Sequence, residues 1–247
     1  MGIPSDDRLV DKPGAWTELA LTLPIFLTYQ LGVVFLNVRN ATDVVTARLL
    51  ELAHGDRVTY LELTAGIGLT LMAVFAVLGR GQALRVRKIV QIAVEGGAYA
   101  VAMGAATSWV VGKMFAGPPA GAADGPIPGL VMSLGAGFYE ELAFRVVLFG
   151  VGAKLLVALF TNERVAVIGS APPLGLRALA IMAVWGVVSA AVFSGMHYVG
   201  ALSDTFDARS FVARAVLGLA LTLIYASRGF AAAVWTHALY DVWVLVL

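Results

Sequence analysis

The chain has 247 residues, of which 60% are hydrophobic and only 13% are charged, and its mean hydropathy is +0.86. Soluble domains carry roughly 25% charged residues, so this composition predicts a polytopic integral membrane protein. The net charge of +1 gives no reason to expect a nucleic-acid partner. Because the chain has no cysteine, disulfides, thiolate metal ligands and a cysteine nucleophile are excluded.

Hydrophobic segments of about 20 residues, enough for one membrane-spanning helix, recur along the whole sequence. They predict an all-α transmembrane bundle of about seven or eight spans, forming a single integral membrane domain over residues 1–247. Residues 40–57 have apolar side chains at helical spacing and a charged face, which suits an interfacial helix or a short tilted eighth span. The predicted spans are 17–37, 60–79, 89–115, 129–160, 178–200, 211–227 and 229–247.

The charges of the short loops predict how the spans are oriented. The loop 80–88 carries four basic residues and is expected to be cytoplasmic, whereas the loop 117–129 carries none and is expected to face outward. Only four of the 17 basic residues are lysine, a bias that indicates a GC-rich bacterial genome. We therefore expect the protein in a bacterial inner (cytoplasmic) membrane.

The sequence FYEELAFR at 138–145 places three charged residues inside an apolar span, where charges are costly and often functional. Glu141 and Arg145 are four positions apart, so on a helix they share a face and can form an ion pair. Glu140 points about a third of a turn away and lacks that partner. A carboxylate in an apolar site suits a general base, so Glu140 is the candidate for chemistry; a purely structural ion-pair network is the alternative.

Two further motifs place histidines in spans near the C-terminus. In FSGMH, Phe193 and His197 are four positions apart and lie on one helical face. In THALYD, His237 and Asp241 have the same spacing, so the carboxylate can orient the imidazole. Each motif alone is also compatible with an ordinary interfacial histidine or a helix-stabilising contact.

Counted from the span ends, these groups all fall in the half of the membrane nearer the 117–129 loop. One shared buried pocket explains the three clusters better than three unrelated contacts. The candidate catalytic residues are Glu140, His197, His237 and Asp241, with Glu141, Arg145 and Phe193 in support.

The ordered motifs EExxxR, FxxxH and HxxxD resemble those of the CAAX protease and bacteriocin-processing (CPBP, or Abi) family of glutamic-type intramembrane endopeptidases, over residues 129–247. The resemblance implies that Glu140 activates a water, that His197 positions it, and that His237 stabilises the oxyanion. It implies no cofactor. The family's last motif often ends in Asn; here Asp241 cannot donate when ionised, so we expect it to orient His237.

Several alternatives stay open. Glu140, His197 and His237 could instead bind zinc as a metalloprotease, and the same fold could serve a transporter or a non-catalytic scaffold. The resemblance extends to bacterial proteins that remove C-terminal sorting anchors, as in the myxosortase system. With the site toward the outer leaflet, the expected substrate is a membrane-anchored protein or a lipidated peptide, cleaved near its C-terminal segment.

Overall fold

The computed structural model describes residues 12–38, 40, 43–115, 125–161, 163, 165, 174–200 and 203–246. In this part of the chain every regular element is a helix and no strand occurs. Six helices are long and apolar enough to cross a membrane, and a shorter apolar helix, α9, follows them. The predicted polytopic, all-helical fold is thus confirmed. Most of the 117–129 loop, on which the predicted orientation depends, lies outside the described residues.

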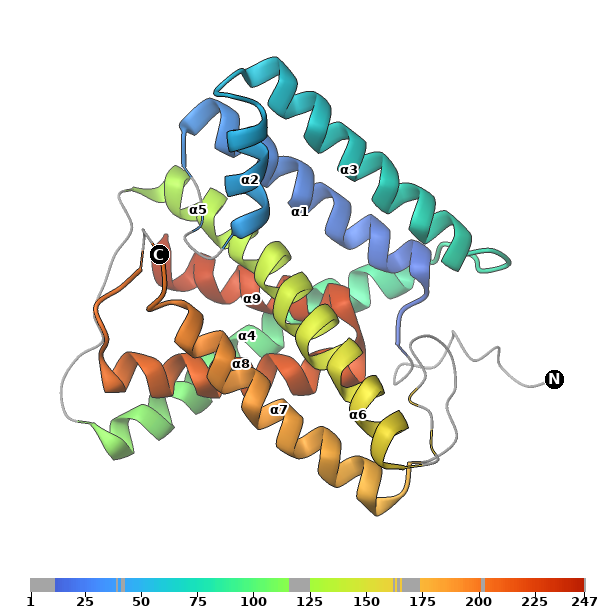
Figure 1. Ribbon diagram of the computed structural model, residues 1–247, viewed down its shortest axis with the longest axis vertical. Coiled ribbons are helices and arrows are strands. Elements are labelled where there is room, and N and C mark those ends of the chain that lie inside the picture. Colours follow the sequence, from blue (N-terminus) through green and yellow to red (C-terminus); the bar gives the residue numbers. More distant parts are fainter. Residues whose placement is uncertain are drawn as a thin grey trace.

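The N-terminal helices form one layer of the molecule (Figure 1). Helix α1 (Ala15–Leu36) packs against α3 (Arg57–Leu78), and the short α2 (Val44–Leu52) lies against α3. The nine residues of α2 reach only about 14 Å, far less than the hydrocarbon core of about 30 Å. Residues 40–57 therefore contain a short helix and not an eighth span.

The two connections in this layer are fixed by aspartates that cap the following helix. The side chain of Asp43 accepts a hydrogen bond from the backbone N–H of Thr46 at the start of α2 (2.9 Å). Asp56 does the same for Thr59 at the start of α3 (2.7 Å). Such caps satisfy N–H groups that a helix cannot pair internally, so both helix starts are set by local sequence.

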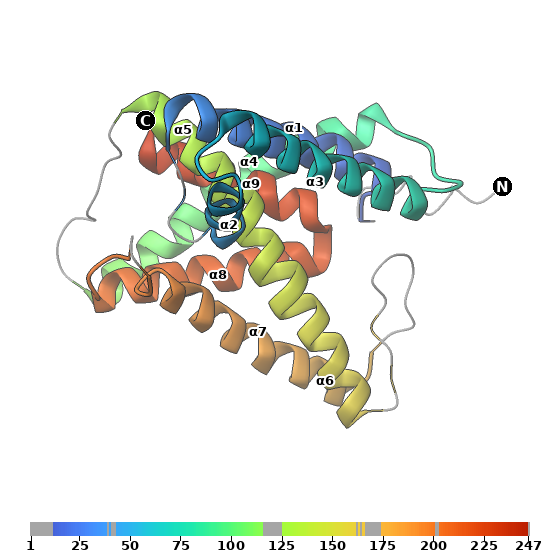
Figure 2. The same ribbon diagram turned by 45° about the horizontal axis from the view of Figure 1, so that its top comes forward.

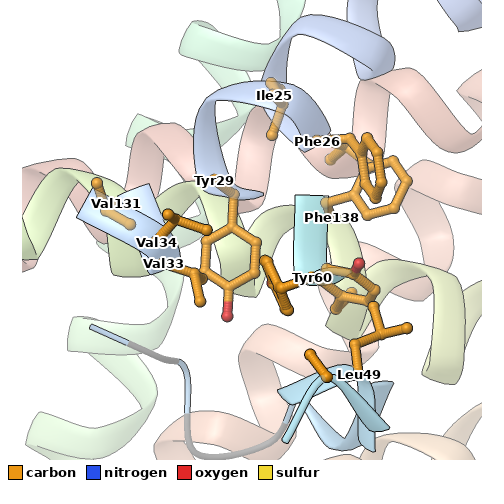
Figure 3. Packing of buried hydrophobic residues seen from close by; sticks show 12 residues of the cluster. Ile25, Phe26, Tyr29, Val33, Val34, Leu49, Tyr60, Val131 and Phe138 are labelled. Carbon is orange, nitrogen blue, oxygen red and sulfur yellow. The ribbon is translucent and has the colours of Figure 1, made fainter. Parts of the chain in front are cut away.

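A buried apolar cluster joins this layer to the rest of the bundle (Figure 3). Phe26 and Tyr29 of α1 are fully buried and face Phe138 and Tyr139, which lie two and one positions before Glu140. The Phe26 and Phe138 ring centroids are 5.2 Å apart, and those of Tyr29 and Tyr139 are 5.7 Å apart. The core packing of α1 therefore bears directly on the segment that carries the two glutamates.

Helix α9 (Phe230–Leu245) lies at the centre of the bundle, where it contacts α1, α4 (Val86–Met114), α5 (Pro126–Gly135) and α8 (Ala208–Arg228). A one-residue turn at Gly229, with φ of 93°, reverses the chain between α8 and α9. The carboxylate of Glu18 on α1 caps the new helix, accepting from the backbone N–H of Phe230 (3.2 Å). The helix that carries His237 is thereby tied to the first span.

The segment Pro126–Phe160 runs as one 35-residue helical rod through α5, a π-helix η2 (Ala136–Val151) and α6 (Gly152–Phe160). In Figures 1 and 2 it crosses the molecule obliquely, from the α1 layer to α7 (Leu176–Met196). At about 1.5 Å per residue it is about 50 Å long, as expected for a span too long for one straight crossing. Long π-helices are rare and π-helical turns are frequent at functional sites; both glutamates lie on this one.

Close packing of η2 on α9 depends on Gly137. A Cβ atom added there would lie 2.8 Å from Cβ of Ala238 and 2.9 Å from the carbonyl oxygen of Val234. Contacts this short do not occur between real side chains, so only glycine allows this approach. The approach places Glu140 and Glu141 beside His237.

Candidate active site

Glu141 is at the centre of a buried ion-pair network. Its side chain is fully buried, and its Oε1 lies 3.0 Å from Nη1 of Arg145, one helical turn on. The same oxygen is 2.7 Å from Nδ1 of His237 on α9. Arg145 also lies over the ring of Phe193, 4.2 Å from its centroid, and donates to the carbonyl of Gly218. The predicted pair of Glu141 and Arg145 is present, and it links η2 to α7, α8 and α9.

Glu140 points to a different part of the site. It is 3% exposed, and its Oε1 accepts a hydrogen bond from the side-chain amide of Asn40 (3.1 Å). Its Oε2 lies 3.8 Å from Nε2 of His197 and 3.9 Å from Nε2 of His237. These two distances are longer than a direct hydrogen bond, so one carboxylate oxygen lies close to both imidazole Nε2 atoms.

His197 caps the C-terminus of α7, and its ring is held from two sides. Nδ1 is 3.0 Å from the carbonyl oxygen of Phe193, which can only accept, so Nδ1 carries a proton. The Phe193 ring packs edge-on against His197, with centroids 5.2 Å apart, as the spacing predicted. Burial lowers the pKa of His197 below its ordinary value, and the nearby Glu140 carboxylate opposes this shift. The neutral ring therefore presents the lone pair of Nε2 toward Glu140.

His237 is 6% exposed and receives its closest polar contact from Glu141 rather than from Asp241. Nε2 is 3.5 Å from Oδ2 of Asp241, so the predicted pair four residues apart is present but longer. Because a carboxylate accepts at Nδ1, that nitrogen carries a proton and Nε2 faces the space beside Glu140. Asp241 thus lies against Nε2 of the ring, while the shorter hydrogen bond, at Nδ1, comes from Glu141.

Asn40 is a site residue that the sequence analysis missed. It lies in the connection between α1 and α2, and it is 8% exposed. A single asparagine just after an apolar span has no spacing relation to Glu140, which is 100 positions away. No local pattern in the sequence could have indicated this contact.

Within the residues that the structure describes, no group of three or more His, Cys, Asp or Glu side chains is placed to hold a metal ion. The nearest set is Glu140 with the two histidines, whose facing atoms are 3.8 and 3.9 Å apart. The site thus brings all seven predicted residues together, from η2, α9 and the C-terminal end of α7.

Comparison with protein families gives the site a context. The model of the Rce1-like family, described as type II CAAX prenyl endopeptidase Rce1-like, matches residues 123–243. This segment of the chain is therefore Rce1-like, which confirms the resemblance that the motifs indicated. This family is one of proteases, and the six apolar helices make the present Rce1-like protein an integral membrane protein. The match begins slightly before the segment 129–247 indicated by the motifs, and it contains every predicted site residue.

The N-terminal helices of this Rce1-like protein, including Asn40, lie outside the matched segment. Searches of curated proteins and of solved structures gave no significant match. The contribution of α1 and Asn40 to the site comes from the structure and not from the family match.

Proposed function

We propose that this protein is a glutamic-type intramembrane endopeptidase in which Glu140 activates the hydrolytic water. The observation that carries the proposal is the position of Glu140 Oε2, which faces Nε2 of His197 at 3.8 Å and Nε2 of His237 at 3.9 Å. A water beside these three atoms could hydrogen-bond to all of them, which is the geometry that a general base requires.

In the proposed reaction, Glu140 removes a proton from the water while the oxygen attacks the carbonyl carbon of the scissile peptide bond. His197 holds the same water through the lone pair of Nε2. The C–N bond then breaks, and the proton on Glu140 passes to the leaving amine. One water is consumed: one of its protons reaches the amine through Glu140, and the other stays on the new carboxylic acid until the products exchange it to give a carboxylate and an ammonium group.

His237 has the position to stabilise the oxyanion of the tetrahedral intermediate. In its protonated form it donates from Nδ1 to Glu141 and from Nε2 toward the developing negative charge. A donor preorganised in a buried site contributes strongly to such catalysis. Glu141 and Arg145 supply the rigid support, because their ion pair fixes the ring from the side opposite the reaction.

The proposed substrate is a membrane-anchored protein or a lipidated peptide, cut near its C-terminal segment within the bilayer. The matched family, described as prenyl endopeptidases, supports a lipid-attached substrate. The loop charges favour a site toward the outer leaflet of a bacterial inner membrane, and with it the C-terminal anchor of an exported protein. The proposed reaction uses no nucleic acid and no metal cofactor.

The test uses the purified protein in proteoliposomes with two peptide substrates, one ending in a prenylated CAAX sequence and one carrying a transmembrane C-terminal anchor. We expect the wild type to cut at least one peptide with or without a strong metal chelator, and Glu140→Gln to cut neither. Loss of activity in chelator, restored by zinc, would replace this mechanism by the metalloprotease. If neither peptide is cut and either solute flux or partner binding depends on Glu140, the protein is a transporter or scaffold instead.

A further inference from the structure

Asn40 donates a hydrogen bond to one oxygen of the Glu140 carboxylate, and the other oxygen faces the histidines. Its amide nitrogen donates to Oε1 (3.1 Å), while Oε2 is the oxygen 3.8 Å from His197 and 3.9 Å from His237. The terminal torsion of a glutamate is broad and nearly two-fold, so the side chain alone does not fix the plane of the carboxylate. A hydrogen-bond donor on one oxygen fixes that plane.

Asn40 is itself anchored through its backbone. The backbone N–H of Asn40 donates to the hydroxyl of Tyr29 (3.2 Å), and that hydroxyl donates to Oδ2 of Asp43 (2.8 Å). Asp43 in turn caps α2 through the N–H of Thr46. These three buried contacts hold the backbone of Asn40 in place, and with it the base of its side chain, before any substrate arrives. Such preorganisation is what a positioning group requires.

The chemistry of the amide also fits this role. A neutral amide can hold one oxygen of a carboxylate without forming an ion pair, whereas Arg145 forms an ion pair with the adjacent Glu141. The two neighbouring glutamates are therefore held by different partners, one charged and one neutral. Because the amide is neutral, it holds Oε1 without adding a positive charge beside Glu140.

We propose that Asn40, from the N-terminal half outside the family-matched segment, is a positioning residue that orients Glu140 so that Oε2 faces the two histidines. The inference rests on the proposed function of Glu140 as the general base. It assigns the first span and its connection a part in catalysis beyond packing.

The kinetic test compares Asn40→Ala with the nearly isosteric Asn40→Asp. If Asn40 positions Glu140, Asn40→Ala lowers kcat by about 10- to 100-fold with KM changed less than about twofold. Asn40→Asp lowers kcat further, because it replaces the donor by a second carboxylate. If Asn40 only fills space, the order of the two losses reverses: Asn40→Ala then lowers kcat more than Asn40→Asp, since Asp preserves the shape of the side chain better than Ala. Asn37→Gly is the matched control, because Asn37 is exposed and has a φ of 55°, which glycine tolerates.

A second measurement needs no substrate. In detergent, Asn40→Asp should have a lower thermal midpoint than Asn40→Ala, and this difference should vanish in a Glu140→Gln background, where the repulsion between carboxylates is gone. A difference that persists with Glu140→Gln would overturn the inference. If both Asn40 variants cleave like the wild type while Glu140→Gln is inactive, the inference fails and the proposed function stands. If the difference in thermal midpoint between the Asn40 variants depends on Glu140 but Glu140→Gln cleaves normally, the proposed function fails. The catalytic role of Asn40 then fails with it.

Discussion

Removing the charge of Arg145 should unfold the site around Glu141. The guanidinium is 1% exposed, lies 3.0 Å from Glu141 and sits over the Phe193 ring at 4.2 Å. Arg145→Met keeps an unbranched apolar stem but leaves the fully buried Glu141 carboxylate without its cation. Breaking a buried ion pair in this way costs about 3–5 kcal/mol of stability. At about 2–4 °C per kcal/mol for a chain of this size, even the lower figure lowers the thermal midpoint by about 6–12 °C.

The assay is a double-mutant cycle of thermal unfolding in detergent with Arg145→Met, Glu141→Gln and the double variant. Because Glu141→Gln removes the stranded charge, the double variant should be more stable than the sum of the single losses predicts. We expect a coupling free energy of about 2–3 kcal/mol, the upper range for residues in one network. If the stability losses of the two single variants add to within about 0.5 kcal/mol, the view that this ion pair stabilises the buried glutamates in the bundle is refuted.

Two further predictions concern the protonation of His197 and the packing behind Glu140. Since burial lowers the pKa of His197, the ring stays neutral down to its ordinary value of about 6.5 and is protonated only below it. We therefore expect kcat/KM to hold from pH 7.5 to about 6.5 and to fall below that; a fall centred above pH 7 would contradict this account. Gly135→Ala places a Cβ 2.2 Å from Cε2 of Tyr29 and should cost about 1–3 kcal/mol by overpacking. In the control Gly195→Ala, the added Cβ has no neighbour within 4 Å, so the stability should stay within about 0.5 kcal/mol of the wild type. Equal losses of stability in the two variants would refute the packing argument.

Spacing along one helix was the information that the sequence carried best. The apolar segments predicted the spans, with ends within a few residues of those observed for α1, α3, α4, α7 and α8. The pairs four positions apart, such as Glu141 with Arg145 and His237 with Asp241, are present as ion-pair contacts. Such predictions succeed because neighbours on a helix are fixed by its geometry.

Contacts between distant segments were not predictable in this way. The hydrogen bond from His237 to Glu141 joins residues 96 positions apart, and that from Asn40 to Glu140 joins residues 100 apart. Both depend on how closely η2 packs on α9 and α1, which is decided by side-chain volume at positions such as Gly137. The π-helical winding of η2 is likewise a result of packing that no periodicity in the sequence indicated.

The roles assigned to the two adjacent glutamates can be compared in one experiment. Glu140→Gln and Glu141→Gln are chemically identical changes at neighbouring buried positions, each measured for single-turnover cleavage and for thermal stability. The account predicts that Glu140→Gln lowers the cleavage rate at least about 100-fold, as expected for loss of a general base, and leaves the thermal midpoint near that of the wild type. It predicts that Glu141→Gln lowers the midpoint by several degrees and retains measurable cleavage. Cleavage by Glu140→Gln at a rate near that of the wild type would contradict the central claim that Glu140 activates the water.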